Sequence, residues 1–412
     1  MSNDKQPEIR FPGFADDWEE RKLGDVINGM YNGQTPSRAN KSNWDGNINW
    51  LTSGELNRGT VTRTIEKITP EGQKDALLKT VPSGTFVMAI TGLEAAGTRG
   101  NCAKLAMDTT LNQSCMALYP NVDLLDSNFL FQWYRKIGED YGLRYTQGTK
   151  QQSYNAELIK ILPITLPKTD EQKKIAKFLD NHDDTIALHQ RQLDLLKETK
   201  KGFLQKMFPK NGVSVPEIRF PGFTEDWEQR KLGEIVRISS GFTGDSSLNT
   251  GQYELTRIET IATGQVNLNK VGYSNTEPDK KYLLDKGDIL FSNINSLSHI
   301  GKIALFDLDM KLYHGINLLR LQPMNVNSQF LYQSFQLNNH LEWAKSHANQ
   351  AVSQASINQT ELSKQVFLVP SQQEQQKIGT FFKQLDDTIT LHQRKLDLLK
   401  ETKKGFLQKM FV

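Results

Sequence analysis

The side chains best suited to chemistry in this sequence are polar and basic residues on predicted loops, where they could hydrogen-bond to the edges of nucleic-acid bases. Arginine and lysine suit guanine, and asparagine and glutamine suit adenine. In the first half of the chain, the candidates for base contact are Ser53, Arg58, Arg63, Thr91, Arg99, Lys150 and Gln151. In the second half, they are Arg257, Asn293, Asn295, Ser296, His299, Lys302, Gln350 and Ser353. For each residue taken singly, the competing interpretation is an ordinary solvated side chain.

Local context distinguishes two of these candidates. Arg99 lies in the glycine-containing stretch 92–100, where a backbone without bulky side chains could approach DNA closely. Lys150 follows the polar stretch 147–149, which predicts a flexible loop. Phe86 and Met88, by contrast, are expected in a strand core.

The sequence carries none of the motifs that would indicate an enzyme. It has no G-x-x-x-x-G-K-[ST] phosphate loop, no G-x-G-x-x-G fingerprint, no H-E-x-x-H zinc helix and no G-x-S-x-G elbow. The stretch 277–280 resembles part of a nuclease carboxylate motif but is interpreted as a turn, because no matching Glu-x-Lys follows it. Cys102 and Cys115 are too few for a zinc site or a disulfide scaffold. We therefore predict a non-catalytic chain without a metal.

An internal repeat positions these loops. The segment 7–14 returns 209 residues later as 216–223, and the run 183–208 returns 203 residues later as 386–411. The longer copies differ only where Ala187 becomes Thr390 and Gln192 becomes Lys395. The segments in between, about 25–165 and 234–369, are barely alike. The chain is therefore a near-constant frame that holds two variable inserts, and two such copies suggest pseudo-twofold symmetry.

A heptad pattern closes each half of the chain. From Ile175, and again from Ile378, mainly apolar residues recur in alternating steps of four and three, with no proline inside either run. The pattern predicts two helices of about 35–40 residues, each about 55–60 Å long. A helix of this length needs a partner for its apolar stripe, and the simplest partner is its own copy. The residues predicted to pair the helices are Ile186, His189, Leu193, Leu196, Phe203, Ile389, His392, Leu396, Leu399 and Phe406.

Polar residues on this seam are interpreted as fixing its register. His189, His392, Lys200 and Lys403 would pair with neighbours or extend their charged ends to solvent, in preference to a catalytic role. The basic end of each helix is also repeated at surface positions. Contact with a partner protein and recent duplication both explain that repetition.

The variable inserts predict an α+β fold. Short apolar runs broken by Gly, Pro, Asn and Ser predict strands, at 84–88, 101–105 and 111–118 and again at 287–292, 302–306 and 315–321. We expect an antiparallel or mixed sheet in each insert. The predicted architecture is two globular domains, each followed by a long helix, with the two helices pairing as an antiparallel coiled coil with pseudo-twofold symmetry.

Length and charge set looser bounds. A chain of 412 residues fits two domains. Its formal net charge of +3 gives DNA binding no support by itself. No apolar run approaches the ~20 residues that span a bilayer, and the polar segment 1–10 lacks the apolar core of a signal peptide. We expect a cytoplasmic protein.

The start of each long helix carries a sequence that resembles a known family. The apolar segment 162–167 ends in a proline and precedes a Glu-Gln-x-x-Ile motif at 171–175, and the segment 367–370 precedes the same motif at 374–378. This doubled, ordered pattern resembles the specificity subunit of type I restriction–modification systems. Asn32–Pro36, with Trp50 and Leu51, also resembles the opening of many target-recognition domains. The second half departs from that opening, because it has Gly241–Gly244 in place of Gly-x-Thr-Pro.

The resemblance implies a division of the chain into five parts. They are a first target-recognition domain at 1–167, a long helix at 168–208, a linker at 209–224, a second target-recognition domain at 225–370 and a second long helix at 371–412.

The resemblance also implies a function. Each globule would read one half of an asymmetric, bipartite target in double-stranded DNA, and the helices would fix the gap. The frame would dock two modification subunits, which methylate adenine N6, and motor-nuclease restriction subunits. S-adenosylmethionine, ATP and magnesium would be bound by those partners, and this chain would hold no cofactor.

Two other functions are compatible with the residues. The chain could be a structural adaptor that joins protein-binding globules, and salt-sensitive binding to one duplex sequence would argue against that. It could instead be a self-sufficient nuclease or methyltransferase, which magnesium-dependent cleavage or methyl transfer by the isolated chain would support.

Overall fold

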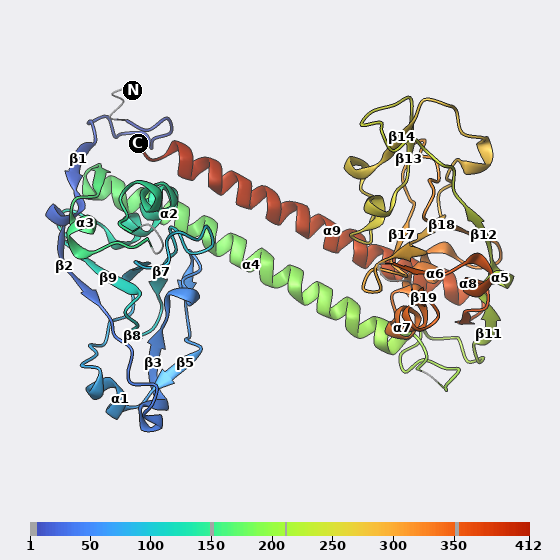
Figure 1. The fold of residues 1–412 in the computed structure, drawn as a ribbon, viewed down its shortest axis with the longest axis horizontal. Coiled ribbons are helices and arrows are strands. Elements are labelled where there is room, and N and C mark those ends of the chain that lie inside the picture. The colour runs from blue at the N-terminus through green and yellow to red at the C-terminus, as the bar shows by residue number, and fades with distance from the viewer. Residues whose placement is uncertain (1–5, 149–151, 211, 351–353) are drawn as a thin grey trace. The chain divides into compact units, whose positions relative to one another are not determined.

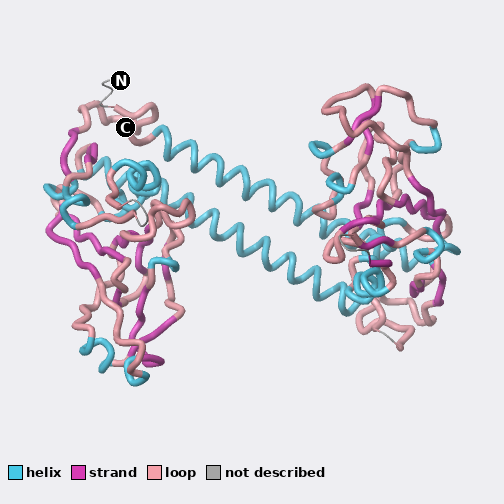
Figure 2. Tube along the Cα trace, in the orientation of Figure 1, coloured by secondary structure: helices cyan, strands magenta, loops and turns pink. Residues whose placement is uncertain are grey.

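The chain folds into two compact units, each of which contains a globule and segments of two long helices. The computed structural model describes residues 6–148, 152–210, 212–350 and 354–412. One unit comprises Met1–Gln190 with Lys395–Val412, and the other comprises Arg191–Arg394. Figure 1 labels the elements, and Figure 2 shows that short strands and loops dominate both globules.

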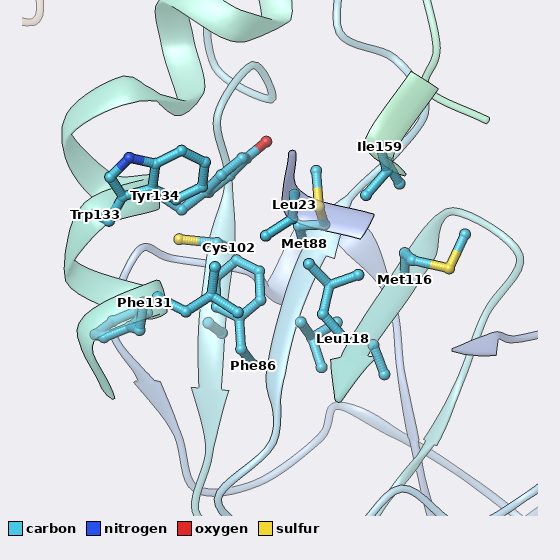
Figure 3. Packing of buried hydrophobic residues seen from close by; sticks show 14 of the residues in the cluster. Leu23, Phe86, Met88, Cys102, Met116, Leu118, Phe131, Trp133, Tyr134 and Ile159 are labelled. Carbon is cyan, nitrogen blue, oxygen red and sulfur yellow. The ribbon is translucent and has the colours of Figure 1, made fainter. Parts of the chain in front are cut away.

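A mixed sheet forms the centre of the first unit. Its strands, within the described residues, lie in the order β2 (Ile27–Asn32), β9 (Cys115–Pro120), β6 (Phe86–Ala89), β7 (Cys102–Leu105) and β4 (Thr60–Val61). Only the β4–β7 pairing is parallel in this sheet. Phe86 and Met88 are fully buried, as expected for strand core. Figure 3 shows Phe86 and Cys102 beside Tyr134 of α2 (Ser127–Arg144), which covers this face of the sheet.

A smaller sheet and short helices complete the first globule. Strand β3 (Trp44–Leu51) pairs antiparallel with β5 (Glu66–Ile68) and parallel with β8 (Thr110–Leu111). Helix α1 (Pro70–Asp75) contacts this sheet, and α3 (Ala156–Lys160) lies beside the turn at Leu23–Asp25. Strands β1 (Glu19–Lys22) and β10 (Pro163–Leu166) pair antiparallel at the start and end of the globule.

The second globule repeats the central sheet. Its strands lie in the order β12 (Val236–Ser240), β18 (Leu319–Pro323), β15 (Ile289–Phe291) and β17 (Ile303–Leu305), all antiparallel. This order matches β2, β9, β6 and β7 of the first unit. The two barely similar inserts therefore share one core topology, and the predicted α+β fold is confirmed.

The remaining elements of the second globule are short. The paired strands are β11 (Glu228–Lys231) with β21 (Val366–Val369), β13 (Tyr253–Leu255) with β14 (Gly272–Ser274), and β20 (Ala355–Ser356) with both β16 (Ile294–Asn295) and β19 (Asn349–Gln350). The helices are α5 (Leu232–Ile235), α6 (Ser328–Phe335), α7 (Asn338–Ser346) and α8 (Gln359–Leu362).

Two strand predictions were wrong in their extent. The run 111–118 does not form one strand, because the Asn112 side chain accepts a hydrogen bond from the Ser114 amide and turns the chain between β8 and β9. The run 315–321 becomes extended only at Leu319, because Asn317 adopts a φ of 69° that interrupts the strand.

The long helices agree with the heptad prediction in length. Helix α4 spans Thr169–Met207, and α9 spans Gln372–Lys409. In the first unit, Phe178 of α4 contacts Phe406 of α9 with ring centroids 4.9 Å apart, and the Lys403 ammonium donates to Asp183. The contacting residues follow one another toward the C-terminus in α4 and toward the N-terminus in α9, so the two segments are antiparallel.

The second unit repeats these contacts with the roles of the helices exchanged. Phe203 contacts Phe381 at 5.0 Å, and Lys200 lies 2.7 Å from Asp386. Of the two arrangements predicted for the seam lysines, the structure shows pairing, because both lysines contact carboxylates. Leu193 and Leu396 are fully buried. The other residues predicted to pair the helices are half-buried, namely Ile186, His189, Leu196, Phe203, Ile389, His392, Leu399 and Phe406.

The repeated N-terminal segments hold the helices in a matching way. Arg10 forms a two-point ion pair with the buried Glu171 at 2.7 and 2.8 Å, and Arg219 does the same with the buried Glu374. We call these two ion pairs the frame clamps. The Ile9 amide donates to the last turn of α9, and the Ile218 amide donates to the last turn of α4. Sequence repetition therefore corresponds to structural repetition.

Candidate nucleic-acid interface

Several loops collect at one end of the central sheet in the first unit. Strands β2 and β6 end at this edge, and β9, β7 and β4 begin there. This follows because β9 is antiparallel to both β2 and β6, β7 is antiparallel to β6, and β4 is parallel to β7. The loops 33–43, 90–101 and 112–114 therefore start or finish at the same edge. We call this edge the loop end of the globule. Loops on a rigid sheet are where binding residues commonly lie.

The Gly-Gln-Thr-Pro opening is held against the end of β8 and the turn that follows it. A Cβ atom at Gly33 would overlap the carbonyl oxygen of Leu111, so only glycine fits here. The Gln34 amide donates to the same carbonyl at 3.0 Å, and the Trp50 indole donates to the Gln34 carbonyl at 3.0 Å. The Thr35 hydroxyl also bonds to the Gln113 side chain. These contacts fix the path of the opening loop.

The structure brings Arg58, Thr91 and Arg99 together at the loop end. Arg58 adopts a φ of 59°, and its guanidinium donates to the Arg99 carbonyl at 2.6 Å and to Asn101 Oδ1 at 3.3 Å. Arg99 in turn donates to the carbonyls of Leu93 and Glu94, both at 2.9 Å. Thr91 pairs with Ser153 in an isolated bridge. Both arginines thus brace the loop 90–101, and their contact with DNA stays a prediction.

The other candidates of the first half have different positions. Ser53 follows β3 and lies near the loop end, because the Asn112 amide donates to the Leu51 carbonyl. Arg63 follows β4, which leaves the loop end parallel to β7, so it lies outside the cluster. Lys150 and Gln151 lie outside the described residues.

An arginine that the sequence did not single out lies on the opening loop. The Arg38 guanidinium carbon lies 3.6 Å from the centroid of the Trp44 ring. Two of its nitrogens donate to the two Glu66 oxygens at 2.6 and 2.8 Å. The Arg38 side chain is nevertheless 56% exposed. The hydrogen bonds from Arg38, together with its charge, hold the pKa of Glu66 below the usual carboxyl range.

The second globule fixes its opening loop without the Thr-Pro motif. A Cβ atom at Gly241 would overlap the Gly315 carbonyl, the same type of close approach as at Gly33. The Phe242 amide donates to His314 O at 2.8 Å, and the Ile316 amide donates back to Phe242 O at 2.9 Å. Phe242 also contacts Tyr282 with ring centroids 5.6 Å apart. The second globule therefore keeps the backbone contact of the opening loop, although its sequence departs from the Gly-x-Thr-Pro pattern.

A cavity of about 220 Å³ lies beside this opening loop. Phe242, Asp245, Arg257 and Asn317 are among its lining residues. The buried His314 ring donates a hydrogen bond from Nε2 to Leu318 O, 3.0 Å away, and burial lowers its pKa to about 4. Because this histidine is neutral near pH 7, it contributes no positive charge to the opening loop.

The structure gathers most candidates of the second half on one loop. Asn293, Asn295, Ser296, His299 and Lys302 lie between β15 and β17, the position of the loop 90–101 in the first unit. The side chains largely bond within the globule. Asn293 donates to Ile357 O, and Lys302 donates to Ala262 O.

The three remaining candidates of the second half are Gln350, Arg257 and Ser353. Gln350 is on β19, in the small sheet that also holds Asn295 on β16. Arg257 lies at the opening-loop cavity instead. Ser353 lies outside the described residues.

The described residues offer no sign of metal or thiol chemistry. Within them, no group of three or more His, Cys, Asp or Glu residues could hold a metal ion. Both cysteines are buried, and burial raises the pKa of the Cys102 thiol to about 12, which keeps it protonated near neutral pH. In the part of the chain that the structure describes, no helix is long and apolar enough to cross a membrane.

Comparison with protein families gives two matches within this chain. The family model described as the type I restriction modification DNA specificity domain matches residues 15–198 and 224–401. Each match covers one globule and most of the long helix that follows it. The matched residues together make up most of the chain.

Relatives and solved structures agree with the family match. The MjaX specificity subunit of Methanocaldococcus jannaschii is 38% identical over 195 residues, which span 45% of this chain and 46% of that subunit. The matched region is thus less than half the length of that relative. The type I restriction enzyme MjaVIII specificity subunit of the same organism is 24% identical over 95% of this chain and 91% of its own length. The crystal structure of an S subunit from M. genitalium has a TM-score of 0.69 over 99% of both chains, at 17% identity, a likeness of fold.

Proposed function

Because the chain belongs to the type I restriction–modification DNA specificity family, we propose that it selects the DNA target of a type I complex by reading two different half-sites, one with each globule. One observation carries this proposal. The same four-strand order recurs in the two globules, while the loops at its end differ in sequence. A constant scaffold with different loops suits two different base sequences.

The modest charge of the chain fits reading by base edges. A net charge of +3 supplies little of the sequence-independent attraction that phosphate contacts provide. Polar side chains at each loop end would supply specificity, and partner subunits would add affinity. The residues proposed for base contact are those of the loop ends, with Arg38 added to the candidates from sequence.

The long helices would set the distance between the two readers. We propose that α4 and α9 pair along their whole length as an antiparallel coiled coil with pseudo-twofold symmetry. The antiparallel contacts inside each unit support this, because the same Phe–Phe and Lys–Asp pairs occur in both with the helices exchanged. Polar pairs on a seam fix its register.

The frame would carry the partner subunits. Two modification subunits would dock on the two copies of the frame and methylate adenine N6 with S-adenosylmethionine, and restriction subunits would supply the ATP- and magnesium-dependent motor and nuclease. This chain would be non-catalytic and hold no cofactor. The near-identical surface residues at the ends of α4 and α9 support equivalent docking at both copies.

The test is to express the chain with its modification subunit and map N6-methyladenine by single-molecule sequencing. We expect methylation at one asymmetric, two-part motif that disappears when the chain is omitted. Exchange of residues 25–165 for those of another specificity subunit should change one half of the motif and leave the other half unchanged. If the modification subunit co-purifies with the chain and is otherwise competent but methylates no motif, DNA reading is overturned and the adaptor function is favoured. Methyl transfer or cleavage by the isolated chain would overturn the non-catalytic role.

A further inference from the structure

Arg38 and Glu66 form an exposed, doubly hydrogen-bonded pair of side chains on the first globule. The two side chains come from different elements, the opening loop and strand β5, and are joined by two hydrogen bonds. The Arg38 Cζ atom lies 3.6 Å from the centroid of the Trp44 ring and 5.3 Å from that of the Trp50 ring. Both side chains stay accessible, with 56% of Arg38 and 39% of Glu66 exposed. An exposed arginine without such support would sample many rotamers.

The elements around the pair support both side chains from below. Trp50 is buried and belongs to a small core with Ile68 and Leu78, and Trp44 packs edge-to-face on Trp50 at 5.1 Å. Glu66 lies opposite Trp50 in the β3–β5 register. The Trp50 indole also holds the Gln34 carbonyl, four residues before Arg38. The pair therefore stands on a packed base that is continuous with the opening loop.

We propose that Arg38 and Glu66 together read one G·C base pair in the half-site of the first globule, an inference that rests on the proposed function. The Glu66 oxygens occupy one N–H of each terminal nitrogen of Arg38, which leaves three guanidinium N–H groups. These donors match the O6 and N7 acceptors of guanine, and a carboxylate oxygen matches the N4 donor of cytosine.

The charge of the pair favours a base edge over a phosphate. A phosphate contact gains from an uncompensated positive charge, whereas the Glu66 carboxylate cancels the charge of Arg38 and would repel a phosphate. A base edge carries no net charge and rewards directional donors and acceptors. The contact with Trp44 and the two hydrogen bonds to Glu66 together hold the guanidinium in place, which a directional contact requires.

The test compares methylation motifs of the co-expressed complex with wild-type chain, Arg38→Ala, Arg38→Lys and Glu66→Gln. Arg38→Lys keeps the positive charge and the aliphatic stem but loses the planar fork. We expect both Arg38 variants to relax one G·C position in one half of the motif, with a loss of about tenfold to a hundredfold in preference for guanine. Glu66→Gln should relax the same position. The other half of the motif should stay unchanged in all three variants.

Lys160→Ala is the matched control, because Lys160 also forms an exposed ion pair, with Glu157 at 2.8 Å, but on the short helix α3, outside both the loop end and the repeated frame. It should leave the motif unchanged. An unaltered motif in both Arg38 variants would overturn base reading by Arg38. A uniform loss of methylation with a lower unfolding temperature would also overturn it, by assigning Arg38 a role in folding. A uniform loss of methylation with a shallower salt dependence would overturn it by assigning Arg38 to a phosphate contact. A wild-type complex that methylates no motif would overturn the proposed function itself.

Discussion

Gly33 and Gly241 show how single residues shape the candidate interface. Each lies where the opening loop crosses another backbone segment, and an added Cβ would overlap a carbonyl oxygen at both positions. The crossing requires the absence of a side chain, and not a special φ. The two inserts differ in almost every loop residue, yet both keep glycine at this crossing. The backbone contact is therefore a common requirement of the two loop ends.

We expect Gly33→Ala to lower the stability of the first unit by about 1–3 kcal/mol, because the loop must move away from Leu111. The same change should weaken reading of one half of the methylation motif, since the opening loop would shift. Calorimetric unfolding and motif mapping measure the two effects. Gly29→Ala is the control, because its Cβ would meet no atom within 4 Å. An unchanged unfolding temperature for Gly33→Ala would refute the crowding argument.

Two buried histidines make the second unit sensitive to acid. The His340 ring stacks on Phe367 at 4.1 Å, and burial lowers the pKa of both His340 and His314 to about 4 from an ordinary 6.5. The unfolded chain binds protons near pH 6.5, whereas the folded chain does not until about pH 4. Their contribution to stability is therefore complete above pH 6.5 and is lost as the pH falls toward 4.

His340→Phe should reduce this loss of stability by roughly half, because one of the two groups no longer titrates. Urea unfolding of the second unit between pH 7 and pH 4 measures the slope. Above pH 7 the curves of variant and wild type should run parallel, which serves as the internal control. An equal slope for both proteins below pH 6.5 would contradict the assignment.

The candidate residues could be predicted from sequence only to a limited extent. The sequence predicts Arg58 and Arg99 as loop residues, and the structure places both at one loop end, but their guanidinium groups brace a loop. The sequence does not single out Arg38, because the position of its side chain depends on Glu66, which is 28 residues away in sequence. A pattern read along the chain does not contain that pairing. The tryptophans at 44 and 50 were the available signal.

At the scale of elements, the two long helices depend on polar contacts as well as on their heptads. Each begins beside a frame clamp, in which an arginine from the repeated N-terminal segment bonds to a buried glutamate in the first turn. The Gln172 and Gln375 side chains next to these glutamates bond to backbone groups before the helix, including the Pro167 and Pro370 carbonyls. This explains the Glu-Gln motif at both helix starts: both side chains tie the helix to its globule.

We expect Arg219→Ala to destabilise the second unit by about 3–5 kcal/mol, because it leaves the Glu374 carboxylate buried without its cation. Arg219→Ala combined with Glu374→Gln should recover part of this loss, since no buried charge then remains. Chemical unfolding of both variants measures the difference. Arg230→Ala, which breaks an exposed pair with Glu228, should cost about 1 kcal/mol or less. Equal costs for Arg219→Ala and Arg230→Ala would disprove the clamp.

Helices were more predictable than strands for a physical reason. A heptad pattern over ten positions specifies a long helix through local spacing alone, and α4 and α9 lie where it indicated. Strand limits depend on single turns, such as the one at Asn112, and on partners far along the chain. The shared order of the central sheets lay beyond sequence comparison, because barely similar inserts carry it.

At the scale of the whole molecule, the repeated frame makes the two globules interchangeable. The clamps, the Ile9 and Ile218 hydrogen bonds and the paired strands β1–β10 and β11–β21 have the same form in both units. A globule moved from one frame to the other would therefore find the same contacts. Antiparallel pairing of the helices would relate two identical globules by a twofold axis.

The proposed symmetry can be tested with a chain that carries residues 25–165 in both positions. In this chain the second copy of 25–165 replaces residues 234–369. With the modification subunit, it should methylate a palindrome in which the half-site of the first globule appears twice in inverted orientation, because a twofold axis inverts one reader relative to the other. The unaltered chain, with its asymmetric motif, is the control. A direct repeat of the half-site would contradict antiparallel pairing while leaving DNA reading intact. An unchanged asymmetric motif would show instead that the exchanged segment does not determine the second half-site.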